Sequence, residues 1–273
     1  MPQWMDKAVI LARGLGTRMK RADAHAPLDD RQQAVAETGV KALIPIGRPF
    51  LDYVLSSLAD AGYRRVCLVV APDHDALRNY YEKQVRPQRL SIEFAVQEHA
   101  RGTADAVAAA EPFAADDPFL VINSDNYYPA EALDRLRRED GLATALFERE
   151  SMLAGSNIPA ERIRDFAVGR IDQEGYLQEI LEKPDEATLA ALPRPIWLSM
   201  NCARFGPPIF QACRAIGPSR RGELELPDAV QYTIDRLGHR IRVVGVRAPV
   251  LDLTSRRDVV AVAPKLAGIE VRL

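Results

Sequence analysis

The sequence contains no long apolar segment. Nowhere in its 273 residues does a run approach the ~18 apolar residues that a membrane-spanning helix needs. The N-terminus also lacks the basic-then-apolar pattern of a secretory signal, because Ala8–Ala12 leads directly into a glycine-rich loop. We therefore expect a cytoplasmic protein that has no membrane partner.

Cysteine and histidine are scarce, and neither forms a cluster. The three cysteines, Cys67, Cys202 and Cys213, are far apart and include no C-x-x-C pair, which predicts reduced core thiols. The four histidines, His25, His74, His99 and His239, show no metal-ligand spacing, which argues against a zinc site. No Ser/His/Asp or Cys/His constellation suggests a protein nucleophile.

An excess of charge of one sign is also missing. The net charge is −2, so the field of the whole molecule gives no reason to expect a nucleic-acid partner. Hydrophobic residues make up 47% of the chain and charged residues 27%, which is typical of globular proteins. With no repeat and no Gly/Ser linker, residues 1–273 are predicted to form a single domain.

What the chain does contain is an alternation of strand and helix patterns, which indicates a parallel sheet covered on both faces. The strands expected in the first half are Lys7–Leu11, Val66–Ala71, Ile92–Val96, Phe119–Asn123 and Ala143–Phe147. The helices expected between them are one beginning at Pro49, Asp75–Val85, Thr103–Ala110 and Pro129–Arg138.

After residue 150 the order loosens, so the sheet is expected to be mixed but mainly parallel. Strands are expected at Phe166–Asp172, Leu177–Leu181, Ile196–Phe205, Ile241–Val246 and Val250–Leu253. Helices are expected at Pro208–Ala215 and Pro227–Leu237, with Ser255 capping a last helix through Val262.

The glycine loop Leu11–Lys20, LARGLGTRMK, follows the first predicted strand and has the composition of an anion site. Gly14 and Gly16 let backbone N–H groups approach an anion, Thr17 adds a donor and Arg18 adds charge. Met19 breaks the dinucleotide fingerprint G-x-G-x-x-G, and the Walker spacing is absent. An ordinary turn with solvated cations is the alternative.

The loop resembles the opening signature of the sugar-1-phosphate nucleotidyltransferases, L-A-x-G-x-G-T-R-[ML]. That family has a Rossmann-like fold. The resemblance implies that Leu11, Ala12, Gly14, Gly16 and Thr17 bind nucleotide. Arg13 is a departure from the pattern, since alanine or glycine is usual there, and it either contacts nucleotide or points to solvent.

Two features follow the glycine loop. Arg21–Gly39 is long, polar and without apolar periodicity, which predicts a functional lid. Lys41 then lies between apolar residues, either directed at a phosphate or snorkelling from a strand edge. The family's Pro-Lys-x-Leu-x-Pro pattern places its lysine at this position, although Val40 replaces the first proline.

Gln97 and the segment Gly102-Thr103-Ala104-Asp105-Ala106 could recognise a base. Glycine at the start of a small-residue helix permits close approach, and Gln97 offers both a donor and an acceptor. Tight helix packing also selects these residues. The resemblance assigns base recognition to Gln97, Gly102 and Thr103, and the GTADAV form is most like ADP-glucose pyrophosphorylases.

Two carboxylates, Asp125 and Asp252, each follow or end an apolar strand, where α/β sheets bind ligands and Mg²⁺ finds oxygen ligands. Capping of a turn is the alternative for Asp125. Their distance in the chain leaves open whether they meet, and only the resemblance joins them in one magnesium site. Ser124 stands where the family has glycine, and the glycine expected after Asp252 is missing.

Late motifs complete the resemblance. Glu182-Lys183-Pro184 matches the family's E-K-P element, which implies that Glu182 binds sugar hydroxyls and Lys183 the sugar phosphate. Asn201 matches a sugar-contacting asparagine, and Arg221–Asp228 resembles a stretch bordering the sugar pocket. A solvated Glu-Lys pair before a turn is the alternative for the first motif.

The order of these motifs implies an Mg²⁺-dependent nucleotidyltransferase of nucleotide-sugar biosynthesis. NTP and sugar 1-phosphate would give NDP-sugar and pyrophosphate by in-line attack on the α-phosphorus. Residues 1–150 would bind nucleotide, and residues 151–273 would bind sugar and complete the metal site. Arg18, Lys41 and Lys183 would be the catalytic cations. A non-catalytic nucleotide- or sugar-binding relative and a molybdenum-cofactor-type guanylyltransferase are the alternatives, and a homo-oligomer is left open.

Overall fold

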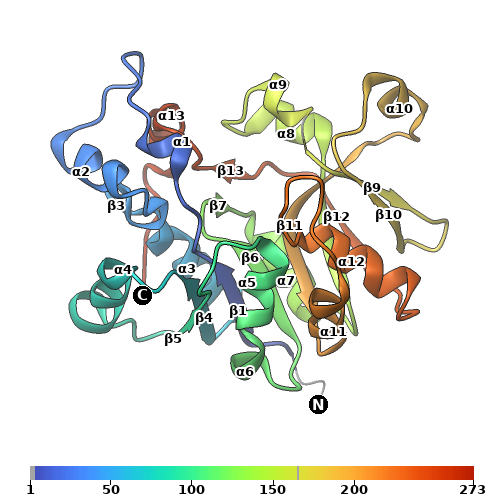
Figure 1. The fold of residues 1–273 in the computed structure, drawn as a ribbon. Helices are drawn as coiled ribbons and strands as arrows, with labels where there is room; N and C mark the ends of the chain where they lie inside the picture. The colour runs from blue at the N-terminus through green and yellow to red at the C-terminus, as the bar shows by residue number, and fades with distance from the viewer. Residues whose placement is uncertain (1–3, 165) are drawn as a thin grey trace.

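The computed structural model describes residues 4–164 and 166–273, and its centre is a nine-stranded sheet (Figure 1). Seven strands follow the order β10-β9-β11-β6-β1-β4-β5, and β8 pairs with β11 and carries β12. The nine strands are β1 (Lys7–Leu11), β4 (Arg65–Val70), β5 (Ser91–Val96), β6 (Phe119–Asn123), β8 (Ala143–Glu148), β9 (Val168–Ile171), β10 (Leu177–Leu181), β11 (Trp197–Phe205) and β12 (Arg242–Val246).

The sheet divides into a parallel half and a mixed half. β1 pairs in parallel with both β4 and β6, and β4 pairs in parallel with β5. β11 runs antiparallel to β6, β8 and β9, whereas β12 returns parallel to β8. The mixed α/β architecture predicted from the sequence is therefore confirmed.

Alternation along the strands gives the sheet two apolar faces. In β1, Ala8 and Ile10 belong to one buried cluster and Val9 to the other. β6 repeats this pattern, because side chains of a strand point alternately to its two faces. The first face is covered by α3 (Phe50–Asp60), α7 (Ala130–Arg138) and α13 (Arg256–Leu266), and the second by α5 (Thr103–Ala109), α6 (Glu111–Ala114), α11 (Pro208–Ala215) and α12 (Leu226–Asp235).

The segment between β1 and α3 differs from the predicted lid. Instead of an unstructured loop it contains α1 (Thr17–Lys20) and α2 (Asp30–Thr38), followed by the 3₁₀ turn η1 (Lys41–Leu43). A capping box starts α2, because Asp29 and Gln32 satisfy each other's backbone N–H groups. The expectation of a structureless Arg21–Gly39 was wrong, since a polar helix that buries only Ala36 leaves no apolar stripe to detect.

Two further departures concern helices. The helix expected over Asp75–Val85 is α4 (Asp75–Asn79), which continues as the π-helix η2 (Tyr80–Val85). Three helices beyond residue 148 were not predicted, and they are α8 (Arg149–Gly155), α9 (Ala160–Ile163) and α10 (Glu186–Ala191). None of the described helices, in residues 4–164 and 166–273, combines the length and apolar character needed to cross a membrane.

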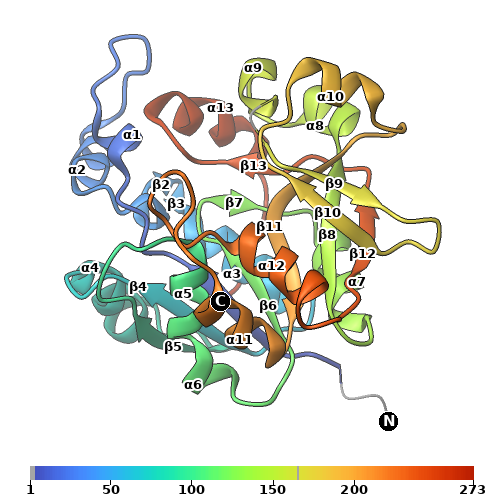
Figure 2. The ribbon, with the colours of Figure 1, turned by 45° about the vertical axis from the view of Figure 1, so that its right-hand side comes forward.

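Two small ribbons lie outside the central sheet. The first joins β2 (Pro45–Ile46) to β3 (Arg48–Pro49), and the second joins β7 (Asn126–Tyr127) to β13 (Leu251–Asp252). Figures 1 and 2 both place β7 and β13 between the α1–α2 segment and the group α8–α10. This second ribbon brings Leu251–Asp252 back to the carboxyl end of β6.

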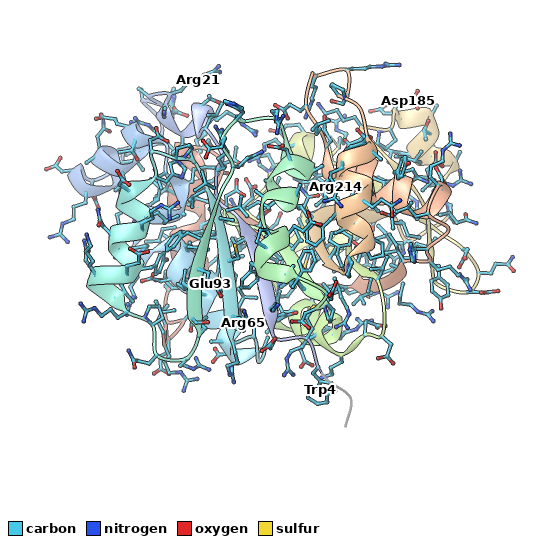
Figure 3. All side chains as sticks on the ribbon, turned by 60° about the horizontal axis from the view of Figure 1, so that its bottom comes forward. Trp4, Arg21, Arg65, Glu93, Asp185 and Arg214 are labelled. Carbon is cyan, nitrogen blue, oxygen red and sulfur yellow. The ribbon has the colours of Figure 1, made fainter. Side chains whose placement is uncertain are left out.

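The two ends of the sheet differ in what they carry. Figure 3 shows Arg65, Glu93 and Trp4 toward one end, while Arg21 and Asp185 lie along the opposite rim. Arg65 and Glu93 form an ion pair between β4 and β5 at 3.6 Å. The three cysteines are buried and unpaired, as predicted, and burial raises the pKa of Cys67 and Cys213 to about 12.

Candidate active site

A cavity of about 410 Å³ opens at the carboxyl ends of β1 and β6. Its lining combines the first and second halves of the chain, as Asn201 of β11 and Thr254, which follows β13, show. The predicted site residues that line it are Leu11, Ala12, Gly14, Gly16, Thr17, Arg18, Lys41, Gln97, Gly102, Thr103, Asp125 and Asn201.

The glycine loop forms one wall. Gly16 adopts a left-handed conformation, with φ of +61°, and a Cβ on it would lie 2.2 Å from the carbonyl oxygen of Gly39. The two ends of the α1–α2 excursion therefore meet, and only glycine fits at the contact. Arg18 is exposed, lines the cavity and has no acidic partner among the described residues. Its charge is therefore available to an anion.

Arg13 joins this wall to the next. Its Nε donates to the carbonyl oxygen of Gln97 at 2.8 Å, and Nη2 donates to that of Glu98 at 3.3 Å. Because both acceptors follow β5, the guanidinium ties the glycine loop to the neighbouring loop. Arg13 therefore has a structural role at the cavity rim. The sequence had suggested only contact with nucleotide or exposure to solvent.

Lys41 reaches Asp125 across the cavity. The 3₁₀ turn η1, rather than a strand edge, carries the lysine, and its Nζ forms an ion pair with Asp125 Oδ2. Both side chains are largely shielded, with exposed fractions of 15% and 20%. The lysine therefore neutralises this carboxylate, and an incoming anion would compete for the same charge.

Asp125 and Asp252 are brought side by side by the second ribbon. Asp252 pairs with Asn126 in the β7–β13 register, and the backbone N–H of Leu253 donates to the carbonyl oxygen of Asp125 at 2.7 Å. Burial raises the pKa of Asp252, and the nearby Asp125 carboxylate raises it further. The tertiary structure thus unites the two carboxylates that spacing alone left apart.

Side chains from α9, from the α8–α9 connection and from β7 hold Asp252 in place. Arg162 Nη2 donates to Asp252 Oδ1 at 2.8 Å, and Asn126 Nδ2 donates to Oδ2 at 3.1 Å. Asn157 pairs with the backbone of Asp252, because its Oδ1 accepts from the N–H at 2.9 Å and its Nδ2 donates to the C=O at 2.8 Å. The charge of Arg162 lowers the pKa that burial raises.

The donor set suits a cation that shares its ligands with substrate. Within residues 4–164 and 166–273, no group of three or more His, Cys, Asp or Glu side chains forms a metal cage. Mg²⁺ is commonly held by one or two carboxylates, with phosphate oxygens and water completing the octahedron. Asp125 and Asp252 meet that requirement for a shared site.

Gln97 is more constrained than the sequence indicated. Its Nε2 donates to the carbonyl oxygen of Gly102 at 2.9 Å and to Asp105 Oδ2 at 2.8 Å. Since both partners are acceptors, the amide nitrogen must face them and only Oε1 is left for a ligand. The expectation that Gln97 offers a base both a donor and an acceptor is corrected to an acceptor alone.

Backbone conformation singles out two of the predicted sugar residues. Asn201 lies in β11 where the register with β8 shifts, and its φ is +51°. Such a bulge redirects a side chain, and Asn201 lines the cavity. Lys183 follows β10 and also has a positive φ, +43°. Such a conformation is uncommon for a non-glycine residue, and Arg86 and Ala115 also adopt it outside the cavity.

Glu182 and Lys183 do not line this cavity. Desolvation raises the pKa of Glu182, and the carboxylate of Glu225 raises it further. The carboxylates of Glu182 and Glu225 therefore lie near each other, which places Glu182 next to the stretch Arg221–Asp228. Of that stretch, Glu223 lines the cavity.

Sequence reasoning missed several residues around the site. Asn123 and Thr254 line the cavity, and Arg162 and Asn157 hold Asp252. Asn123 ends a strand beside Leu11 in the register of β1 and β6, so its position could have been inferred. Arg162 and Asn157 carried no such signal, because they lie in a connection with no predicted element.

Comparison with known proteins places this geometry among enzymes that handle nucleotides. The sequence model of one protein family, described as nucleotidyl transferase, matches residues 7–248. UTP–glucose-1-phosphate uridylyltransferase AglF of Haloferax volcanii is 27% identical over 92% of this chain and 93% of its own length.

Other similar proteins are longer than this chain. The low-salt glycan biosynthesis nucleotidyltransferase Agl11 of Haloferax volcanii is 26% identical over 84% of this chain. Glucose-1-phosphate thymidylyltransferase of Streptomyces griseus is 29% identical over the same share. The chain spans 57% of the length of each.

A solved structure shows the same fold. The crystal structure of a UDP-glucose pyrophosphorylase complexed with UDP-glucose superposes with a TM-score of 0.72. The alignment covers 96% of this chain and 98% of that one, at 18% sequence identity. At this identity the likeness concerns the arrangement of the backbone.

Proposed function

This chain belongs to the nucleotidyl transferase family, and from that membership and the cavity at β1 and β6 we propose that it couples a nucleoside triphosphate to a sugar 1-phosphate, releasing pyrophosphate. The support comes from one convergence in particular. The glycine loop with Arg18, the Lys41–Asp125 pair and the bulged Asn201 all face one cavity. Relatives named as uridylyl- and thymidylyltransferases of glucose 1-phosphate agree with this reaction class.

The chemistry needs no nucleophile from the protein. An oxygen of the sugar phosphate forms a bond to the α-phosphorus, and the bond from that phosphorus to the α–β bridging oxygen breaks. Pyrophosphate leaves with both electrons of that bond. Catalysis then depends on holding the two substrates in line and on neutralising charge as it develops. Arg18, whose charge is uncompensated, would meet the departing pyrophosphate.

The remaining cations would act on the two phosphates. Lys41 would leave Asp125 for a phosphate oxygen when the triphosphate enters, because the more highly charged ligand attracts it more strongly. Lys183 would contact the sugar phosphate, with Glu182 and Asn201 binding the sugar hydroxyls. The glycine-loop residues Leu11, Ala12, Gly14, Gly16 and Thr17 would bind the nucleotide.

Asp125 and Asp252 are the residues that would hold Mg²⁺. Bound there, the ion would supply positive charge to the phosphates of the nucleotide. Arg162 would keep Asp252 ionised and oriented toward the Mg²⁺ site that it shares with Asp125.

The free acceptor of Gln97 limits how a base can be recognised. Its Oε1 can accept from a ring N–H, which uracil and thymine present between two carbonyl groups. Guanine N1–H and the amino group of adenine are donors as well, so this acceptor requires a donor on the base but does not choose among bases. Relatives named as uridylyl- and thymidylyltransferases support UTP or dTTP, which we propose as substrate in place of the adenine suggested by the short GTADAV match.

A substrate panel tests the proposal. Four NTPs crossed with a set of sugar 1-phosphates, followed by pyrophosphate release, should show turnover with UTP or dTTP and little with ATP. Chelation with EDTA should abolish that turnover, and Mg²⁺ should restore it. Glucose 1-phosphate is the first sugar to include, because relatives are named as uridylyl- and thymidylyltransferases of that substrate.

Two other results would contradict the proposal. Nucleotide binding without pyrophosphate release for any pair would identify a non-catalytic relative. Turnover of GTP with a pterin-type acceptor, and with no sugar phosphate, would instead identify a guanylyltransferase of the molybdenum-cofactor type.

A further inference from the structure

The first residue of α13, Arg256, has a buried guanidinium with an exposed fraction of 5%. Its Nε donates to the carbonyl oxygen of Met19 at 3.2 Å and its Nη2 to that of Lys20 at 3.4 Å. Its Nη1 donates to Gln33 Oε1 at 2.9 Å. One side chain thus connects α13 with both α1 and α2.

These partners are unusual because none of them is charged. Arginine is rarely buried without a carboxylate, since taking a charge out of water is costly. Among the described residues, Arg256 has no ion pair. Met19 and Lys20 end the short helix α1, where carbonyl groups lack partners within the helix. Arg256 supplies donors that satisfy them.

The position of Arg256 connects two parts of the candidate site. It follows Asp252 by four residues, and Met19 comes directly after Arg18. The intervening segment is held firmly, because Ser255 and Asp258 form a capping box and Asp258 also accepts from Asn157. A displacement of α1 relative to Asp252 would therefore have to break the contacts of Arg256.

We propose that Arg256 is a positioning residue that holds α1, and with it Arg18 and the glycine loop, in register with the Asp252 carboxylate. The inference rests on the proposed function, because it assigns the β- and γ-phosphates of a nucleoside triphosphate to the loop that Arg256 supports. The base contacts that we propose lie on Gln97 and Gly102, which Arg256 does not touch. Loss of Arg256 should weaken recognition of the triphosphate and spare that of the nucleoside.

The variant Arg256→Gln keeps a polar side chain but removes its charge and two of its three donor nitrogens. In calorimetric titrations with Mg²⁺ and no sugar phosphate, the Kd for UTP or dTTP should rise roughly 10-fold to 100-fold, the scale of one lost hydrogen bond to a charged group. The Kd for the corresponding nucleoside monophosphate should stay within about twofold, because it lacks the two outer phosphates. A role in general stability would shift both Kd values together.

A matched control lies at the next position. Arg257 has an exposed side chain that pairs with Asp23 in the same excursion, so Arg257→Gln makes the same charge change on the same helix turn. Exposed pairs of this kind contribute little, and both Kd values should be unchanged. If Arg256→Gln does not fold, Gln33→Met removes one acceptor of Arg256 and should weaken triphosphate binding in the same direction.

The outcomes separate this inference from the proposed function. If the wild-type protein binds no nucleoside triphosphate, the proposed function fails. If it binds and turns over substrate while Arg256→Gln keeps its triphosphate Kd, or loses triphosphate and monophosphate equally, the positioning role of Arg256 is overturned.

Discussion

Individual residues in this site are often defined by the partner that they already hold. Arg13 donates to backbone carbonyl groups, the amide nitrogen of Gln97 already donates to protein acceptors, and Lys41 forms an ion pair with Asp125. Residue type alone did not reveal these contacts, because each side chain has several possible partners in the chain. Arg18 is the contrasting case, since no acidic partner competes for its charge within the part of the chain that the structure describes.

Arg162 gives a prediction at this scale. Burial and Asp125 raise the pKa of Asp252, whereas the guanidinium of Arg162 lowers it by stabilising the ionised form. Removing that charge in Arg162→Gln should raise the pKa further, so that Asp252 protonates at a higher pH. The acidic limb of kcat/KM against pH should then move to higher pH, with activity at alkaline pH retained.

The control for this prediction is two residues away. Arg164 pairs with Glu186 at 3.2 Å on the surface, so Arg164→Gln makes the same change in charge without contacting Asp252. An unshifted acidic limb in Arg162→Gln, or an equal shift in both variants, would show that Arg162 does not tune this carboxylate.

At the scale of elements, the site is assembled by irregularities in otherwise regular structure. The bulge in β11 aims Asn201, the 3₁₀ turn η1 carries Lys41, and the ribbon of β7 and β13 joins Asp125 to Asp252. Periodicity predicted the long strands and amphipathic helices around them. It could not predict these short pieces, because two or three residues contain no period to read.

Gly102 gives a prediction for one such piece. Its φ of +119° and ψ of 178° belong to a region that only glycine enters readily, and a Cβ would lie 2.3 Å from the carbonyl oxygen of Leu224. That carbonyl accepts from Ala104 N–H at 2.9 Å, which fixes the start of α5. Gly102→Ala should therefore lower the free energy of unfolding by ~1–3 kcal/mol and raise KM for the NTP.

Gly238→Ala is the control that separates steric overlap of the added Cβ from the cost of a positive φ. Gly238 also has a positive φ, +70°, but a Cβ there would meet no atom within 4 Å. Urea unfolding should show a cost of only ~1 kcal/mol, with KM unchanged. If Gly102→Ala behaves like this control, the close approach to Leu224 has no functional role.

At the scale of the whole molecule, one buried carboxylate couples stability to pH. Asp52 on α3 is fully buried and accepts from Arg48 Nε at 3.2 Å, Tyr80 at 2.9 Å and Tyr81 at 3.0 Å. It thereby attaches α3 to η2, at a distance from the candidate site. Burial raises the pKa of Asp52 above its usual range despite these donors.

The sign of the effect follows from that shift. The folded protein holds the Asp52 proton more tightly than the unfolded chain, so the contribution of Asp52 to stability falls as pH rises from about 4, the ordinary range of a carboxyl group. Asp52→Asn lacks this dependence, and its thermal midpoint should gain on the wild type as pH rises toward 7. Asp60→Asn, which removes an exposed carboxylate from the same helix, is the control, and matching pH profiles for both variants would contradict the prediction.

The sequence by itself determined the layered architecture, the family resemblance and most of the cavity residues. Strand alternation such as Ala8, Val9 and Ile10 is a local property that directs side chains to two faces. Parallel pairing then brings the carboxyl ends of β1 and β6 together, which places the glycine loop near Asp125. The helix α2 escaped notice because its caps and polar surface carry little periodic signal.

Only the tertiary structure decided how the two halves of the chain meet. Asp252 reaches Asp125 through a two-residue ribbon, and Arg162, Asn157 and Arg256 hold that ribbon and α1 in place. These contacts join residues far apart in the chain, so their formation depends on the packing of every element between them. Local sequence patterns do not reveal contacts between residues so far apart in the chain. In the folded protein, each of these buried polar groups needs a hydrogen-bond partner, and the closed network of donors and acceptors fixes which partner it has.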